Sequence, residues 1–111
     1  MSDQEKLHQQ LGDIGVRYLK RTLGEITVLS EKLLSLRSGQ PGALKEIEHL
    51  SHKIHGSGAM FGFDELSRHA RDIEVAAGAG TPDAPQLHDQ LERHIADLAA
   101  AAQTAAQERN I

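Results

Sequence analysis

The chain has 111 residues, a formal net charge of −4 at pH 7 and no cysteine. This length suits one domain and leaves no room for a kinase or nucleotide-binding domain beside it. The lack of cysteine excludes disulfides and thiol chemistry, and the interspersed charges offer no basic face for nucleic acid.

The start of the chain is polar and lacks an apolar signal region, and no apolar run approaches the about 18 residues of a membrane span. We therefore expect a single domain over residues 1–111, in a free-standing cytoplasmic protein.

The first third of the sequence predicts two helices that meet near Gly12. Ser2 with Glu5 three residues later forms a capping-box pattern, which would start a short N-terminal helix. Asp13 can cap a long amphipathic helix that runs to about Arg37, because apolar residues follow at spacings of three and four. The predicted inner stripe of this long helix consists of Leu19, Leu23, Ile26, Ser30, Leu33 and Leu36.

A further helix begins at about Pro41 or Gly42, at the end of the breaker-rich residues 38–42, and runs to Met60, with Gly62 at its C-terminal stop. On a helical wheel its inner stripe lies within about 60° of Ile47. The other members of this stripe are Leu44, Leu50, Ile54, Gly58 and Phe61. His52 falls near 140° and Gly56 near 180°, so an imidazole stands on the outer face one turn before a glycine.

Glycine inside a helix costs roughly 0.5–1 kcal/mol relative to alanine, so Gly56 and Gly58 each need a reason. The inward Gly58 would let a neighbouring helix approach closely. The outward Gly56 indicates a smooth patch beside His52 where the backbone of another protein comes close.

Two more helices complete the chain. Asp64 would cap a third helix that ends at Gly78 and Gly80, and Thr81-Pro82-Asp83 would start the last helix, which runs to about Gln107. The inner stripes of these two helices are Leu66, Ala70, Ile73 and Ala77, then Leu87, Leu91, His94 or Ile95, and Leu98. No strand signal appears. The predicted fold is all-α: an antiparallel up-down four-helix bundle with the short N-terminal helix as an extra element.

The residues His52-Lys53-Ile54-His55-Gly56-Ser57-Gly58, followed by Gly62, resemble the signature of histidine-containing phosphotransfer (HPt) domains. That signature reads His, any residue, Leu, Lys, Gly, Ser, Ala, with a Gly ten positions after the His. His52 matches the phosphorylated histidine. His55 stands where the family usually has Lys, so a side chain that is only partly charged at pH 7 replaces a fixed positive charge.

The resemblance implies a phosphorelay intermediate of two-component signal transduction. His52 would accept a phosphoryl group from the aspartyl phosphate of a receiver domain and pass it to another receiver. The implied partners are response-regulator receiver domains and hybrid sensor kinases, and neither nucleic acid nor a membrane is expected. The chain would be a monomeric carrier without kinase activity or a cofactor of its own, because the receiver would bring Mg²⁺.

Several neighbours of His52 are candidates for supporting this chemistry. Glu48, one turn earlier, could accept an imidazole N–H and so fix the tautomer. Lys45, Lys53 and His55 could screen the phosphoryl charge, and Gly56 and Ala59 border the open patch. The side chains of Glu48, Lys45, Lys53 and His55 are each equally compatible with an ordinary solvated position. For Ser57 we expect a structural hydrogen bond to the preceding turn, and for His8, His69, His88 and His94 surface or boundary positions.

Two other functions remain open. His49, His52 and His55 repeat every three residues, and such spacing can chelate Zn²⁺. However, His49 and His55 lie about 120° apart on the wheel and do not converge easily with His52, and metal sites in bundles point inward. Alternatively, the bundle is an adaptor that docks through the same patch without phosphorylation.

Overall fold

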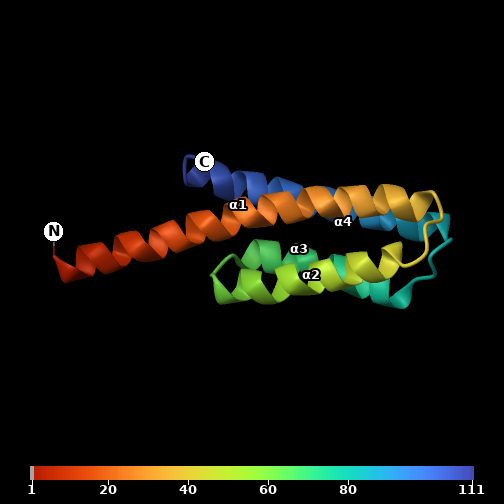
Figure 1. The fold of residues 1–111 in the computed structure, drawn as a ribbon, viewed down its shortest axis with the longest axis horizontal. Coiled ribbons are helices and arrows are strands. Elements are labelled where there is room, and N and C mark those ends of the chain that lie inside the picture. Colours follow the sequence, from red (N-terminus) through yellow and green to blue (C-terminus); the bar gives the residue numbers. More distant parts are fainter. Residues whose placement is uncertain (1) are drawn as a thin grey trace.

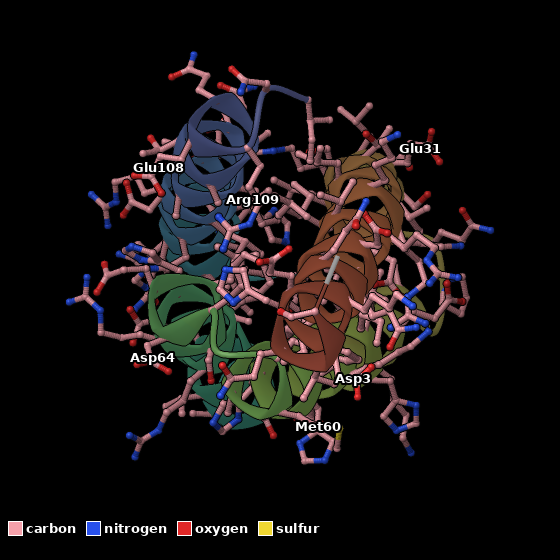
Figure 2. The ribbon with its side chains drawn as sticks, turned by 90° about the vertical axis from the view of Figure 1, so that its left-hand side faces the viewer. Asp3, Glu31, Met60, Asp64, Glu108 and Arg109 are labelled. Atoms are coloured by element: carbon pink, nitrogen blue, oxygen red, sulfur yellow. The ribbon has the colours of Figure 1, made fainter. Side chains whose placement is uncertain are left out.

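The computed structural model describes residues 2–111, which form four α-helices and no strand. The helices are α1 (Asp3–Arg37), α2 (Ala43–Met60), α3 (Asp64–Ala79) and α4 (Pro85–Glu108). They run up and down around one core (Figure 1), and the end-on view of Figure 2 shows them surrounding it. α1 and α3 each pack against α2 and α4. The predicted four-helix bundle is confirmed.

α1 is one continuous helix of 35 residues, so the prediction of a separate short N-terminal helix is wrong. Ser2 caps α1 as expected, because its hydroxyl oxygen accepts a hydrogen bond from the backbone N–H of Glu5 at 3.2 Å. Gly12 keeps a helical backbone without positive φ, and a helix tolerates one glycine at a cost of about 1 kcal/mol. The first part of α1 projects past the other three helices (Figure 1).

The core is aliphatic, and the predicted stripes of α3 and α4 are buried throughout, with Ile95 rather than His94 inside. In α1 the buried residue is Leu29, not Ser30, because Leu29 keeps the helical spacing between Ile26 and Leu33. In α2, Ile47, Ile54 and Gly58 are buried as predicted, whereas Leu44 and Leu50 are half-buried and Phe61 is 38 % exposed. Among residues 2–111, no helix is both long and apolar enough to cross a membrane.

The turn between α2 and α3 follows the prediction closely. Gly62 has a φ of 82°, and the N–H of Phe63 donates to the carbonyl of Gly58 at 2.7 Å, which closes the end of α2. A Cβ built on Gly58 would lie 3.1 Å from the backbone nitrogen of Ser67, so Gly58 does allow α3 to approach closely. Asp64 is the first residue of α3 rather than its N-cap, which is Phe63.

α4 begins later than predicted. The proline in its first turn is Pro85, not Pro82, because residues 81–84 form a turn in which the N–H of Ala84 donates to the carbonyl of Thr81 at 3.2 Å. The Nε2 atom of His88 reaches back to the carbonyl of Pro82 at 2.6 Å. His88 is therefore buried against this turn, in contrast to the predicted surface or boundary position.

Candidate functional site

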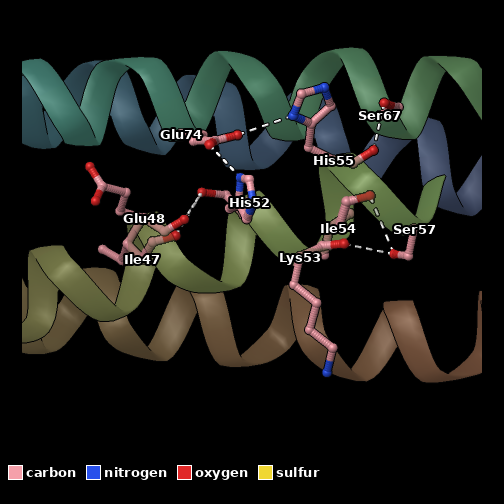
Figure 3. A network of polar contacts seen from close by, with 10 residues as sticks. Ile47, Glu48, His52, Lys53, Ile54, His55, Ser57, Ser67 and Glu74 are labelled. Atoms are coloured by element: carbon pink, nitrogen blue, oxygen red, sulfur yellow. Dashed lines mark hydrogen bonds and ion pairs between the residues drawn. The ribbon is translucent and has the colours of Figure 1, made fainter. Parts of the chain in front are cut away.

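His52 lies near the middle of α2, on the side that faces α3 and solvent (Figure 3). Its side chain is 71 % exposed, which confirms the predicted outer-face position. The neighbouring residues Ser51 and Ile54 are fully buried, and the Ser51 hydroxyl donates to the carbonyl of Ile47 at 2.7 Å. The imidazole is therefore accessible on a backbone that the core holds firmly.

The two ring nitrogens of His52 have different environments. Nδ1 lies 2.6 Å from Oε1 of Glu74 on α3. An ionised carboxylate only accepts hydrogen bonds, so Nδ1 is the nitrogen that carries the proton. Nε2 then keeps its lone pair, and the exposure of the side chain leaves this nitrogen available to a reacting group.

Glu74 also receives a hydrogen bond from His55, whose Nδ1 lies 3.1 Å from Oε2 (Figure 3). Burial of the carboxylate raises the pKa of Glu74, but the hydrogen bonds and charges of His52 and His55 together outweigh this effect. The net pKa lies below the ordinary value of 4.5. Glu74 is therefore an anion at neutral pH and holds two imidazole rings in place.

The structure gives Glu74 the role that sequence analysis assigned to Glu48. The Glu48 carboxylate turns toward α3 instead, where a Cβ built on Gly78 would lie 2.6 Å from its Oε2 atom. No signal within α2 could have identified Glu74, because a helical wheel of one helix carries no information on the register of the facing helix.

The other predicted supporting residues divide between two sides of α2. Lys53 points toward α1, where its Nζ lies 2.8 Å from Oε2 of Glu25, and so it is paired away from the His52–Glu74 contact. Lys45 is exposed and borders a hollow near the α1–α2 loop rather than the one beside His52. Gly56 and Ala59 are exposed, and a Cβ on Gly56 would meet nothing within 4 Å.

A surface hollow of about 550 Å³ lies beside the two histidines, between α2 and α3. Arg71 on α3 lines this hollow together with His52, His55 and Glu74. Its guanidinium is always charged, so Arg71 supplies a fixed cation on the face where the family motif would place a lysine. No signal within α2 points to Arg71 either, because Arg71 also lies on the facing helix.

Ser57 has the structural role expected for it. Its hydroxyl lies 2.8 Å from the carbonyl oxygen of Lys53 and 3.0 Å from the Tyr18 hydroxyl. Tyr18 in turn stacks on Phe61 with ring centroids 4.6 Å apart. These contacts fix the end of α2 against α1, one turn beyond the phosphoacceptor candidate.

Comparison with known protein families matches residues 3–104, nearly the whole chain, to the model described as Hpt domain. No curated protein and no solved structure matches the chain. Hpt domains are helical bundles that act in phosphorelays of two-component signalling, where they interact with receiver domains and kinases. By this match and by its helical bundle, the chain belongs to the Hpt domain family.

Proposed function

We propose that this protein is a phosphorelay intermediate whose phosphoacceptor is Nε2 of His52. The donor is the aspartyl phosphate of a receiver domain, and a second receiver takes the group onward. The observation that carries the proposal is the 2.6 Å contact between His52 Nδ1 and Glu74, which leaves Nε2 as the exposed nucleophile. In this proposal the protein acts as a monomer. It works in the cytoplasm, where the receiver domains that it would serve are also found.

The transfer step requires little from this chain. The lone pair of Nε2 attacks phosphorus, a new N–P bond forms, and the P–O bond to the donor aspartate breaks, so that the aspartate leaves as a carboxylate. Nδ1 keeps its proton throughout, and the ring gains one positive charge. The Glu74 carboxylate stabilises that charge at hydrogen-bonding distance, because it is already in place before the reaction. Transfer to the next receiver is the reverse step.

The remaining residues of the site would affect the approach of the receiver and the charge around the phosphoryl group. Arg71 and His55 border the hollow that would hold the phosphoryl oxygens, and the open surface at Gly56 and Ala59 would admit the backbone of the receiver. Mg²⁺ and the acidic residues that hold it would come with the receiver. In this proposal the chain is a phosphoryl carrier and has no kinase activity of its own.

The decisive experiment is to incubate the protein with a phosphorylated receiver domain and to test for an acid-labile, base-stable label on this chain. His52→Ala should abolish the label and leave the free energy of unfolding within about ±0.5 kcal/mol, because an exposed side chain contributes little. The matched control is His49→Ala, an exposed histidine one turn earlier on α2, which should retain the label.

A label that persists in His52→Ala would contradict the proposal, as would its loss in His49→Ala. A wild-type chain that binds the phosphorylated receiver but never takes up the label would instead support the non-phosphorylated adaptor.

A further inference from the structure

Three metal-ligating side chains from two helices converge at the phosphoacceptor. His52 and His55 from α2 and Glu74 from α3 offer one ligand atom each, and these atoms all lie within 4.8 Å of one another. We infer that the three residues form a binding site for a divalent transition-metal ion such as Zn²⁺, and that the bound ion blocks phosphoryl acceptance by His52.

The distances suit a tetrahedral ion after a small rearrangement of the three side chains. Zinc binds imidazole nitrogen at about 2.0–2.1 Å and carboxylate oxygen at about 2.0–2.2 Å, so the ligand atoms of a tetrahedral site lie roughly 3.3–3.5 Å apart. The two nitrogen–oxygen separations are now 2.6 Å and 3.1 Å. These two contacts use different oxygens of Glu74, and one ligand atom from each residue lies within 4.8 Å of the others, so rotations of the three side chains would bring the ligand atoms to tetrahedral separations.

The surroundings permit this movement and select the class of ion. The side chains of His52 and His55 are 71 % and 37 % exposed, so their rings can rotate without disturbing the core, and solvent can supply the fourth ligand. Two imidazoles and one carboxylate favour zinc and its neighbours in the first transition row over Mg²⁺ or Ca²⁺, which prefer oxygen ligands.

The structure changes the ligand set that the sequence suggested. His49 borders the same hollow but does not belong to the converging group. Its place is taken by Glu74, from the facing helix, and so the angular objection to a cluster of His49, His52 and His55 does not apply. His55, which stands where the family motif has lysine, is one of the three ligands. A lysine at this position could not replace it, because its ammonium group carries a positive charge and has no lone pair to offer the ion.

Metal binding and phosphoryl acceptance compete for the same lone pairs. A neutral imidazole carries one proton, so an ion on Nδ1 of His52 would move that proton to Nε2 and remove the nucleophilic lone pair. An ion on Nε2 would cover the nucleophile directly. This blocking effect rests on the proposed function of His52, whereas the metal site itself does not.

The first experiment measures binding of the metal alone to tag-free protein that has been stripped with a chelator. Calorimetric titration with Zn²⁺ should give one ion per chain, and Co²⁺ should give the visible absorption of a tetrahedral site. Loss of a residue that only supports a metal ligand typically weakens metal affinity about 10–100-fold. His55→Lys and Glu74→Gln should each weaken the affinity for Zn²⁺ by at least this factor, because each removes or alters a direct ligand. His49→Ala is the matched control and should bind as the wild type does.

The second experiment uses phosphoramidate as donor, so that no receiver and no Mg²⁺ are present. Its P–N bond breaks, ammonia leaves, and the N–P bond forms at Nε2 of His52. Saturating Zn²⁺ should abolish labelling of the wild type, and a chelator should restore it. Labelling of His55→Lys, relative to its own metal-free rate, should be insensitive to the same Zn²⁺ concentration.

The outcomes separate the two proposals. The metal site would be overturned if Zn²⁺ did not bind at one ion per chain. It would also be overturned if His49→Ala and His55→Lys lost the same amount of Zn²⁺ affinity. A wild type that binds Zn²⁺ and is labelled at the metal-free rate would overturn the block. A chain that binds Zn²⁺ through the three ligands but takes no label when metal-free would support the metal site and refute the phosphoacceptor role.

Discussion

A single carboxylate determines how the imidazole of His52 is presented. Glu74 accepts hydrogen bonds from His52 and His55 through its two oxygens, so one side chain of α3 positions two side chains of α2. Because that carboxylate is an anion, the proton of His52 is held at the inner nitrogen and the outer nitrogen faces solvent. The chemistry of the site therefore depends on the contact between two helices as much as on the motif within one.

The lowered pKa of Glu74 predicts a specific dependence of stability on pH. The folded protein holds this carboxylate ionised more strongly than the unfolded chain does. Its contribution to the free energy of unfolding is therefore fully present above the ordinary pKa of 4.5 and is lost as the pH falls through the lowered value. In the presence of a chelator, the wild type should lose more stability than Glu74→Gln between about pH 5 and pH 3.

Urea unfolding at several pH values measures this difference. The matched control is Asp72→Asn, on the exposed side of the same helix. If the wild-type and Glu74→Gln curves run parallel over the acid range, the contacts with the two histidines do not stabilise the carboxylate.

Gly56 allows stability and docking to be measured separately. Because its Cβ would meet open space, Gly56→Ala should raise the free energy of unfolding by up to the about 0.8–1.0 kcal/mol by which a helix prefers alanine. Gly56→Gln should slow transfer from a receiver, because reacting atoms must come within about 3–3.5 Å and a long side chain would intervene.

Thermal melts test the alanine variant, and transfer rates at several receiver concentrations test the glutamine variant. Labelling by phosphoramidate, which needs no docking, should be equal in Gly56→Gln and the wild type. If Gly56→Gln accepts the phosphoryl group from the receiver at the wild-type rate at every receiver concentration, this surface is not used for docking.

At the scale of the helix, α1 differs from the others because much of its N-terminal part has no neighbour. Residues 2–14 are all exposed, whereas Tyr18 and Leu19 are buried in the bundle. This first part remains helical without tertiary contacts, with the Ser2 cap as its start. It therefore contributes little to the stability of the core.

Removal of residues 2–12 should leave the bundle folded. Asp13 would then stand at the start of α1, where an aspartate can cap the exposed N–H groups, as the sequence suggested. The free energy of unfolding should change by less than about 1 kcal/mol, and labelling of His52 by phosphoramidate should be unchanged. Chemical unfolding of the full and shortened chains measures the effect, and collapse of the shortened bundle would contradict it.

Helix features could be predicted from the sequence where they depend on residues close together in the chain, and not where they depend on contacts between distant residues. The stripe of α3 and the stop at Gly62 depend on residues close in sequence, and both were predicted correctly. The start of α4 at Pro85 was not, because two prolines offered similar local signals and the turn is closed by the buried ring of His88. Glu74 was missed because its role arises only when α3 packs on α2 in one register.

The projecting part of α1 gives the whole molecule an elongated shape. Its extents are 56 × 21 × 18 Å, and its radius of gyration is 15.6 Å, against about 13 Å for a compact domain of this length. The projection carries exposed Leu7, Leu11 and Ile14 at spacings of four and three. A seam this short falls below the three to four heptads that indicate a coiled coil, so we expect a monomer.

Sedimentation equilibrium and small-angle scattering test this expectation together. The full chain should sediment as a monomer, and its radius of gyration should fall when residues 2–12 are removed. A dimer that Leu11→Glu dissociates would instead identify the exposed leucines as an interface between two copies.

Under the proposed function, the position of His52 on one open face between α2 and α3 has a kinetic consequence. A carrier with a single loading point cannot be charged by one partner while it is discharged by another, so the donor must leave before the acceptor arrives. The two partners then compete for occupancy, and signal flux is limited by the slower of the two departures. Under this constraint, a mutation that tightened either complex would lengthen its residence time and reduce the overall throughput.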